Sequence, residues 1–157
     1  MNAPSRNDPG SLDPGSLDPG SQGPYESGTG AGRVVVLTAP SGAGKTTIAN
    51  ALLDQIPGLR FSVSATTRPP RTYEQDGVHY HFVSAERFAA FIAEGRLLEY
   101  AEVYPGRFYG TLRSEVERAA ETGPVLLDID VQGALNVKRL YGDRALTVFI
   151  RPPSLEV

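Results

Sequence analysis

A chain of 157 residues, 40 % of them apolar, has the size and composition of one globular domain. Its formal net charge of -3 excludes a surface that attracts nucleic acid over its whole area, so a bound anion has to be held by a local cluster of cations. Cysteine is absent, which excludes disulfides and thiolate metal sites and fits a reducing cytoplasm. No apolar run reaches the roughly 20 residues of a membrane span, and the first residues lack the apolar centre of a secretory signal. We therefore expect a cytoplasmic protein with no membrane or nucleic-acid partner.

Residues 1–32 consist mostly of Gly, Pro, Ser, Asp and Asn, and the unit "DPGSL" recurs with a period of five from Asp8 to Gln22. Asp-Pro-Gly favours turns, and a period of five matches neither a helix nor a strand. Because it has almost nothing to bury, this segment is expected to be a disordered extension. The alternatives are a tether or interaction tail, and a start codon placed too far upstream.

The rest of the chain begins with a predicted strand over residues 33–38, "RVVVLT", whose β-branched residues run without polar alternation. A helix is predicted over residues 46–55, before the breaker "PG". The runs "PVLLDID" (124–130) and "ALTVFI" (145–150) have the same pattern of a strand buried on both faces, and a helix is predicted between them over residues 131–141. This alternation predicts an α/β fold, with a parallel sheet core and right-handed crossovers that place helices on both faces.

The middle segment, residues 61–123, has short and polar strand candidates: "FSVSATT", "VHYHFV", "RLLEYAEV" and "RFYGT". Helices are predicted near residues 85–94 and 112–122. We interpret this segment as a small mixed α+β insertion carried on a core made of residues 33–60 and 124–157.

A glycine-rich loop, "APSGAGKT", follows the first strand and matches the phosphate-binding pattern G-x-x-x-x-G-K-[ST], except that Ala39 replaces the first glycine. Backbone amides from Gly42 to Thr46 would face one phosphate, with the positive end of the following helix behind them. Lys45 would bridge the β- and γ-phosphates, and the Thr46 hydroxyl would bind Mg²⁺. The alternative is a glycine-rich turn with a solvated lysine. The residues expected to bind ATP are Ala39, Pro40, Ser41, Gly42, Ala43, Gly44, Lys45, Thr46 and Thr47.

Two arginines stand close together in "SATTRPPR", where prolines stiffen the chain into an extended path. No acidic residue separates Arg68 from Arg71, so the pair is expected to repel unless an anion lies between the two guanidinium groups. Each guanidinium offers a planar fork to phosphate oxygens. The pair predicts a second phosphate site, whereas either arginine alone would be an ordinary surface cation.

Several separate motifs together resemble guanylate kinases, the family that phosphorylates GMP with ATP: "TAPSGAGKTT", "FSVSATTRPPR", "GVHYHFVSAERF", "LLEYAEV", "FYGT", "LLDIDVQGA" and "FIRPPS". The resemblance covers residues 33–157, and the alanine variant of the glycine loop also occurs in that family. It implies that the GMP phosphate is held by Arg68, Arg71, Tyr80 and Tyr109. It also implies that the guanine is held by Ser64, Glu99, Thr111 and Asp130.

The chemistry of guanine favours a carboxylate such as Glu99 independently of the resemblance. Guanine presents an N1–H and an amino group side by side, and both donate, whereas adenine has an unprotonated N1 at that edge. Mispairing a buried polar group costs roughly 1–3 kcal/mol, enough for at least tenfold discrimination. The alternatives are an exposed strand carboxylate for Glu99, a helix N-cap for Thr111, and packing aromatics for Tyr80 and Tyr109.

Two aspartates end the strand "LLDID" and are expected on one face because strand side chains alternate. Asp128 is assigned to Mg²⁺, directly or through water, as in other phosphate-loop proteins. Asp130 has the alternative role of N-cap to the next helix. His79 and His81 are interpreted as solvated strand residues because no third metal ligand stands near them, and "TYEQDG" as a charged turn.

These features predict phosphoryl transfer from ATP·Mg²⁺ to GMP, with Lys45, Arg68 and Asp128 as the catalytic residues. The chain stops at "FIRPPSLEV", where guanylate kinases continue into a lid that brings further arginines to the transferred phosphate. We therefore expect either poor turnover or a fragment of a longer protein, with apolar surface uncovered near Val148 and Ile150. The other hypotheses are a non-catalytic guanylate-kinase-like module that binds nucleotides or proteins, and a nucleoside monophosphate kinase with another acceptor.

Overall fold

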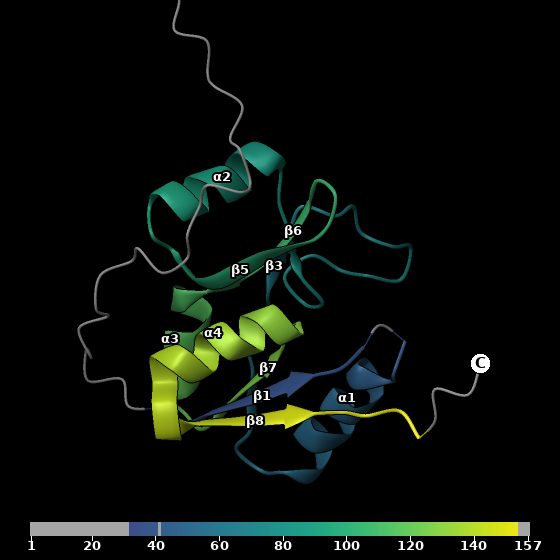
Figure 1. Ribbon diagram of the computed structural model, residues 1–157, viewed down its shortest axis with the longest axis vertical. Coiled ribbons are helices and arrows are strands. Elements are labelled where there is room, and N and C mark those ends of the chain that lie inside the picture. The colour runs from purple at the N-terminus through teal and green to yellow at the C-terminus, as the bar shows by residue number, and fades with distance from the viewer. Residues whose placement is uncertain (1–31, 41, 154–157) are drawn as a thin grey trace, which may run out of the picture.

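This computed structural model describes residues 32–40 and 42–153, so the five-residue repeat and Ser41 of the glycine loop lie outside the described residues. One sheet is fully parallel, with the strand order β2-β7-β1-β8. Figure 1 shows helices packed against both of its faces. The strands are β1 (Val34–Thr38), β2 (Arg60–Phe61), β7 (Val125–Asp128) and β8 (Ala145–Phe149).

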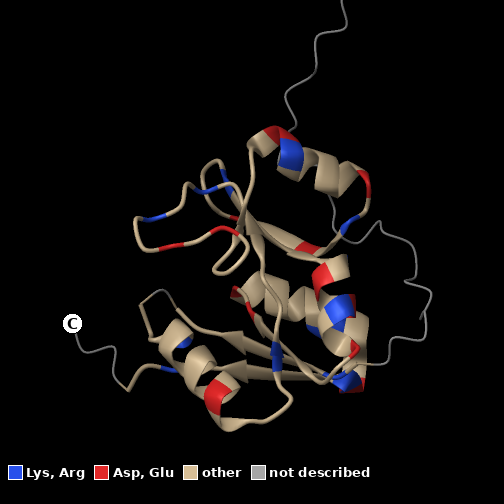
Figure 2. Ribbon diagram, turned by 180° about the vertical axis from the view of Figure 1, so that it is seen from behind, with Lys and Arg blue, Asp and Glu red and all other residues tan. Residues whose placement is uncertain are grey.

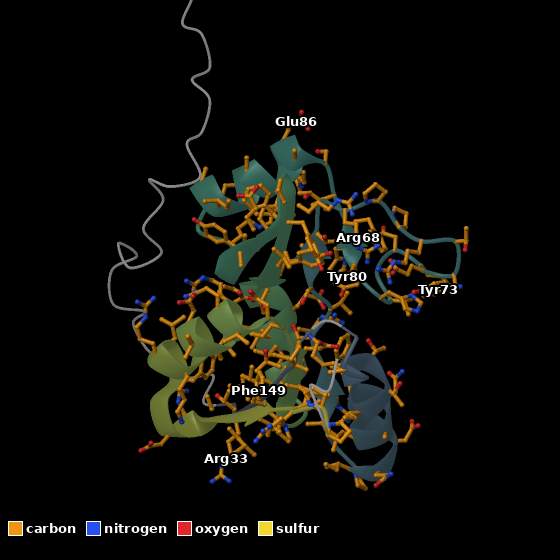
Figure 3. The ribbon with its side chains drawn as sticks, turned by 45° about the vertical axis from the view of Figure 1, so that its right-hand side comes forward. Arg33, Arg68, Tyr73, Tyr80, Glu86 and Phe149 are labelled. Atoms are coloured by element: carbon orange, nitrogen blue, oxygen red, sulfur yellow. The ribbon has the colours of Figure 1, made fainter. Side chains whose placement is uncertain are left out.

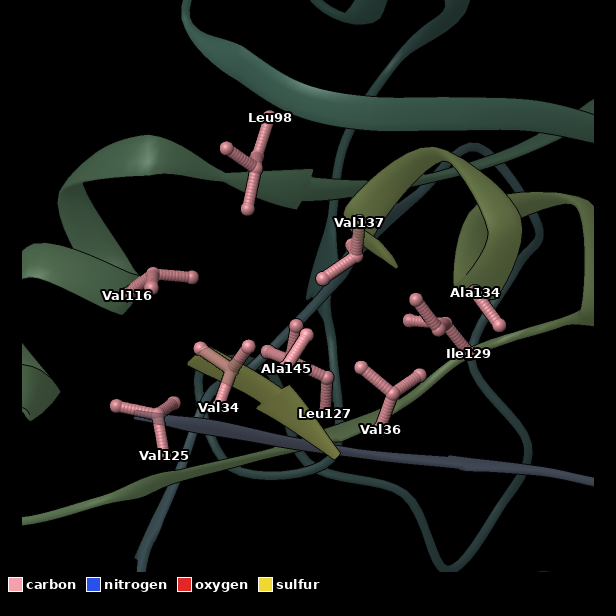
Figure 4. Close-up of a cluster of buried hydrophobic side chains, with 10 residues drawn as sticks. All are labelled: Val34, Val36, Leu98, Val116, Val125, Leu127, Ile129, Ala134, Val137 and Ala145. Atoms are coloured by element: carbon pink, nitrogen blue, oxygen red, sulfur yellow. The ribbon is translucent and has the colours of Figure 1, made fainter. Parts of the chain in front are cut away.

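The two faces of this sheet are covered by different helices because alternate residues of β1 point in opposite directions. Val34 and Val36 face α3 (Arg113–Ala120) and α4 (Val131–Tyr141) and form the cluster of Figure 4 with residues of those helices. Leu37 faces the other way and packs with Ala49 of α1 (Lys45–Gln55). A 3-10 turn, η2 (Gly142–Arg144), joins α4 to β8.

A second, mixed sheet has the order β4-β3-β6-β5, with one parallel pair and two antiparallel pairs. Its core is formed by Phe88 and Phe91 of α2 (Ala85–Ala93), which pack on Leu97 and Leu112 of the sheet. Ser84 caps α2 by accepting a hydrogen bond from the Arg87 amide. The strands are β3 (Ala65–Thr66), β4 (His81–Phe82), β5 (Leu97–Tyr104) and β6 (Arg107–Leu112).

Helix α4 joins the two sheets, because it contacts β1 and β8 on one side and β5 on the other. Leu98 of β5 belongs to the same buried cluster as Val137 of α4. The α/β fold with a parallel core, helices on both faces and a separate mixed sheet is therefore confirmed.

The boundary expected at residue 61 falls inside β2, which pairs with β7 of the parallel sheet. Helix α3 also belongs with that sheet, because its buried Val116 packs against Val125. We therefore infer that the insertion unit comprises residues 62–112, and that the parallel core contains β1, β2, β7, β8, α1, α3 and α4.

The expectation that β8 is buried on both faces is wrong. Only Ala145 is buried, whereas Leu146 and Phe149 are 62 % and 54 % exposed. The reason is that β8 is an edge strand, paired on one side by β1. The exposure expected near Val148 is confirmed, at 38 %, but Ile150 is half-buried against the cluster that contains Leu37.

No helix among residues 32–40 and 42–153 has the length and apolar character needed to cross a membrane. Basic and acidic positions lie mainly on the helices and loops and are interspersed there (Figure 2), and no single charge dominates the ribbon. The attraction of an anion therefore depends on local groupings of side chains.

Candidate active site

The glycine loop places a lysine against an aspartate of the neighbouring strand. Gly42 and Gly44 have φ values of 79° and 81°, in the left-handed region that glycine tolerates. Helix α1 begins immediately afterwards, and Lys45 Nζ lies 2.8 Å from Asp128 Oδ1. The same amine donates a hydrogen bond to the Ile129 carbonyl at 3.3 Å. Because β1 and β7 are parallel neighbours, the loop and the end of β7 meet at one edge of the sheet.

The other described loop residues flank Lys45 in the sequence. Ala39 is half-buried, and every positive φ in the described part of the chain belongs to a glycine, so alanine fits the first position of the motif without strain. Thr46 and Thr47 are exposed in the first turn of α1. The Ala43 amide donates to the Pro40 carbonyl at 3.2 Å, which closes the loop. Thr46, whose hydroxyl is expected to meet Mg²⁺, is thus open to solvent and directly follows Lys45 in the chain.

The two aspartates of "LLDID" have different surroundings. Asp128 ends β7 and pairs with Lys45. Asp130 stands at the N-cap of α4, where its carboxylate accepts the Gly133 amide at 3.0 Å. Its alternative role as a helix cap is confirmed, and the Gly133 that it caps also lies close to Glu99 of the insertion unit.

Arg68 is held by protein groups on all three of its side-chain nitrogens, and its side chain is 9 % exposed. Nε donates to the Tyr109 hydroxyl at 3.2 Å, Nη1 donates to the Pro69 carbonyl at 2.9 Å, and Nη2 donates to both Glu74 oxygens at 3.0 Å. Burial lowers the pKa of Arg68, but its bonds to Glu74 and Tyr109 outweigh burial and raise that pKa overall. The guanidinium therefore remains charged.

The anion expected between the two guanidinium groups is supplied by the protein itself, because the chain turns back and brings Glu74 between them. Its carboxylate contacts Arg68 and also lies 3.9 Å from Arg71 Nε. Burial opposes ionisation of Glu74, but hydrogen bonds from Arg68 and the Arg71 amide hold its pKa below the ordinary value. "TYEQDG" is therefore more than a charged turn.

The two predicted tyrosines both contact this arginine group. The Tyr109 hydroxyl accepts from Arg68, and the Tyr80 ring centroid lies 5.3 Å from the Arg68 guanidinium carbon. Figure 3 shows Arg68 and Tyr80 together in the insertion unit, on the side that lies above α1. Burial raises the pKa of Tyr80, and the negative charge of Asp128 raises it further. The charge of Asp128, in the parallel core, thus reaches Tyr80 in the insertion unit.

A buried carboxylate, Glu99, lies where β5 and β6 meet α4. Glu99 is 6 % exposed, so the alternative of an exposed strand carboxylate is wrong. Thr111, directly opposite on β6, donates its hydroxyl to Glu99 Oε1. The alternative of Thr111 as a helix cap is also wrong, because Leu112 occupies the N-cap of α3.

Burial raises the pKa of Glu99 to about 7, an effect that the Thr111 hydrogen bond offsets in part and the Asp130 charge increases. A Cβ atom on Gly133 would stand 2.5 Å from Glu99 Oε2 and 2.9 Å from Asp130 Oδ1. The first turn of α4 therefore leaves room for two carboxylates only because residue 133 has no side chain. Ser64, also predicted at this site, is buried in the segment before β3, where its carbonyl accepts the His81 amide.

The two histidines are more engaged than solvated strand residues. His79 Nδ1 accepts the Gln75 amide at 2.9 Å, and His81 Nε2 lies 3.3 Å from Glu115 Oε1. No cluster of three or more His, Cys, Asp or Glu side chains suited to a metal occurs in the ranges 32–40 and 42–153.

Sequence reasoning missed Glu74 and Gly133. The signal for Glu74 was its position three residues after Arg71, a spacing at which opposite charges meet in a turn. The signal for Gly133 was a glycine in the first turn of a helix, where it weakens the helix unless close packing requires it.

A glycine loop at the carboxyl end of a parallel strand, followed by a lysine that begins a helix, defines an α/β protein of the phosphate-loop class. A sequence model described as guanylate kinase matches residues 31–157. The chain belongs to the guanylate kinase family.

Relatives and solved structures agree with that assignment. The chain is 68 % identical over 123 residues to the guanylate kinase of Salinibacter ruber, covering 78 % of this chain and 65 % of the relative. It is 50 % identical over 129 residues to that of Bacteroides fragilis, covering 82 % and 63 %. The crystal structure of guanylate kinase from Anaplasma phagocytophilum is similar with a TM-score of 0.65 and 36 % identity, over 75 % of this chain and 58 % of that one. The chain thus spans less than two thirds of the length of these proteins.

Proposed function

We propose that the protein is an ATP:GMP phosphotransferase, with ATP at the glycine loop and GMP in the insertion unit. The observation that carries the proposal is the buried pair of Glu99 and Thr111, with the half-buried Asp130 beside it, in the same protein as the Arg68 cation and the Lys45 loop. Phosphoryl transfer needs charge neutralisation and alignment more than covalent chemistry from the protein.

The donor side consists of the loop from Ala39 to Thr47. Its backbone amides and the start of α1 favour an anion, and Lys45 supplies a full positive charge for the β- and γ-phosphates. Lys45 pairs with Asp128 at 2.8 Å. Binding of ATP therefore requires the amine to share its interactions between Asp128 and the phosphates.

The residues beside the loop fit Mg²⁺, which is commonly held by one or two carboxylates together with substrate phosphates. Thr46 and Asp128 are the residues that would hold it. When bound, the ion neutralises phosphate charge and fixes the orientation of the phosphate chain.

The acceptor side divides into a phosphate end and a base end. Arg68, Arg71, Tyr80 and Tyr109 would surround the GMP phosphate. Ser64, Glu99, Thr111 and Asp130 would contact the guanine. Ionised Glu99 accepts hydrogen bonds from guanine N1–H and the amino group, whereas adenine would place a lone pair against it.

A coupled assay of ADP release with GMP, AMP, CMP and UMP as acceptors tests this proposal. Turnover with GMP alone supports it. Preference for another nucleotide contradicts the acceptor assignment. If the chain shows no turnover and calorimetry detects no GMP binding, the proposal that it is an ATP:GMP phosphotransferase is contradicted altogether.

A further inference from the structure

Glu74 is an acidic residue with a largely covered side chain, to which the proposed reaction assigns no part. It follows the exposed Tyr73 in the turn after Arg71, yet its own side chain is only 5 % exposed. A carboxylate with so little of its side chain exposed is costly unless it is paired and hydrogen-bonded. Its surroundings therefore indicate what it is paired with and what that pairing achieves.

Among the described residues, the hydrogen bonds and ion pairs of the Glu74 carboxylate are all with the arginine segment. Both oxygens accept from Arg68 Nη2 at 3.0 Å, and Oε2 also accepts the Arg71 backbone amide at 3.4 Å. The Arg71 guanidinium lies farther away, with Nε at 3.9 Å, and is 63 % exposed. Glu74 thus fixes one arginine firmly and leaves the other in solvent.

This pairing completes the immobilisation of Arg68. The other two side-chain nitrogens donate to the Pro69 carbonyl and the Tyr109 hydroxyl. The rings of Tyr80 and Phe82 lie 5.3 and 5.7 Å from its guanidinium carbon. A free arginine side chain would otherwise keep many rotamers, and a ligand would have to remove that freedom on binding at a cost in affinity.

We propose that Glu74 is a positioning residue for the acceptor phosphate, which acts by holding the Arg68 guanidinium in its binding orientation before the nucleotide arrives. This inference rests on the proposed function, because it takes the phosphate of GMP as the ligand of Arg68. Glu74 acts through Arg68 and does not contact the nucleotide. Arg68, Arg71 and Glu74 together carry a net charge of only +1. Binding of the acceptor phosphate should therefore depend more on the orientation of the Arg68 guanidinium than on the total charge of the site.

The test measures the Kd of GMP and of guanosine by calorimetry for the 157-residue chain and its variants. Glu74→Ala removes the contact, and Glu74→Gln keeps the shape and one acceptor while removing the charge. We expect the Kd of GMP to rise about tenfold or more in Glu74→Ala, because a charge-assisted hydrogen bond is lost, and by less in Glu74→Gln. The Kd of guanosine should stay unchanged in both variants, since guanosine has no phosphate.

Glu94→Gln is the matched control, because Glu94 pairs with Arg96 at 3.5 Å on the exposed end of α2, and both side chains are largely exposed. Its Kd for GMP should equal that of the unaltered chain. Circular dichroism and Tm for every variant report whether the chain folds, and Glu74→Gln keeps the test decisive if Glu74→Ala does not fold.

A double-mutant cycle with Arg68→Ala separates positioning from general stabilisation. If Glu74 acts through Arg68, replacing Glu74 in the Arg68→Ala background should change the Kd of GMP by less than twofold. Equal weakening of GMP and guanosine, additive effects in the cycle, or tighter GMP binding in Glu74→Gln would overturn the inference. Failure of the unaltered chain to bind GMP would instead contradict the proposed function.

Discussion

The raised pKa of Glu99 makes the recognition of guanine depend on pH. The buried carboxyl has a pKa of about 7, against an ordinary value of 4.5. Guanine presents two donors, so it needs the ionised carboxylate, which accepts at both oxygens. A protonated Glu99 keeps one acceptor and places its own O–H against a guanine donor.

The size of the effect follows from the ionised fraction of Glu99. With a pKa of about 7, roughly nine tenths of the groups are ionised at pH 8 and one tenth at pH 6. Because the apparent Kd is the intrinsic Kd divided by the competent fraction, it should rise about tenfold from pH 8 to pH 6. The second ionisation of a phosphate also falls near pH 6, so guanosine is the cleaner ligand.

The assay is calorimetric titration of guanosine between pH 6 and pH 8, with the unaltered chain and Glu99→Gln. The variant cannot ionise at residue 99, so its affinity should be weak and nearly independent of pH. A pH dependence of equal size in Glu99→Gln, or none in the unaltered chain, would refute the reasoning.

The same group predicts the direction of a change in folding stability. The folded chain holds the Glu99 proton more tightly than the unfolded chain, so the free energy of unfolding should fall as the pH rises from about 4.5 to about 7. The difference between these two values corresponds to about 3 kcal/mol as an order of magnitude. Urea denaturation at pH 5 and pH 8 measures it, and the slope should be shallower in Glu99→Gln.

Three further predictions concern the loop, the base site and the edge strand. Lys45→Ala should lower ADP release by about 10³-fold or more while circular dichroism stays unchanged, and retention of most of the rate would contradict the role of the loop. Gly133→Ala should weaken guanosine binding and lower Tm, because its Cβ would stand 2.5 Å from Glu99 Oε2, and unchanged binding would show that the carboxylates can shift freely. Phe149→Ser should leave the free energy of unfolding within about 0.5 kcal/mol, since Phe149 is 54 % exposed, whereas Phe88→Ala, at a position 1 % exposed, should cost about 3–5 kcal/mol in urea denaturation.

Much of the frame could be predicted from local patterns. The buried run before the glycine loop, the helix after it and the β7–α4–β8 unit depend on short-range periodicity and on breakers, and the structure has them close to the expected residues. Gly42 and Gly44 adopt the backbone conformations that the loop motif requires. Burial was harder to predict, because β8 has the composition of an inner strand but lies at the edge of its sheet.

The candidate site depended on contacts between residues distant in sequence. Thr111 reaches Glu99 because β5 and β6 pair in a particular register, and Gly133 meets Glu99 because α4 packs against β5. Glu74 lies against Arg68 because the chain reverses direction between them.

The sequence by itself determined that this chain has a parallel phosphate-loop core and two arginines on a stiff segment, since both follow from backbone preferences over a few residues. Only the tertiary structure decided which acid neutralises Arg68, which carboxylate is buried with a raised pKa, and which strand lies exposed. Those properties depend on distance and solvent access, which are set by how the two sheets and α4 pack together.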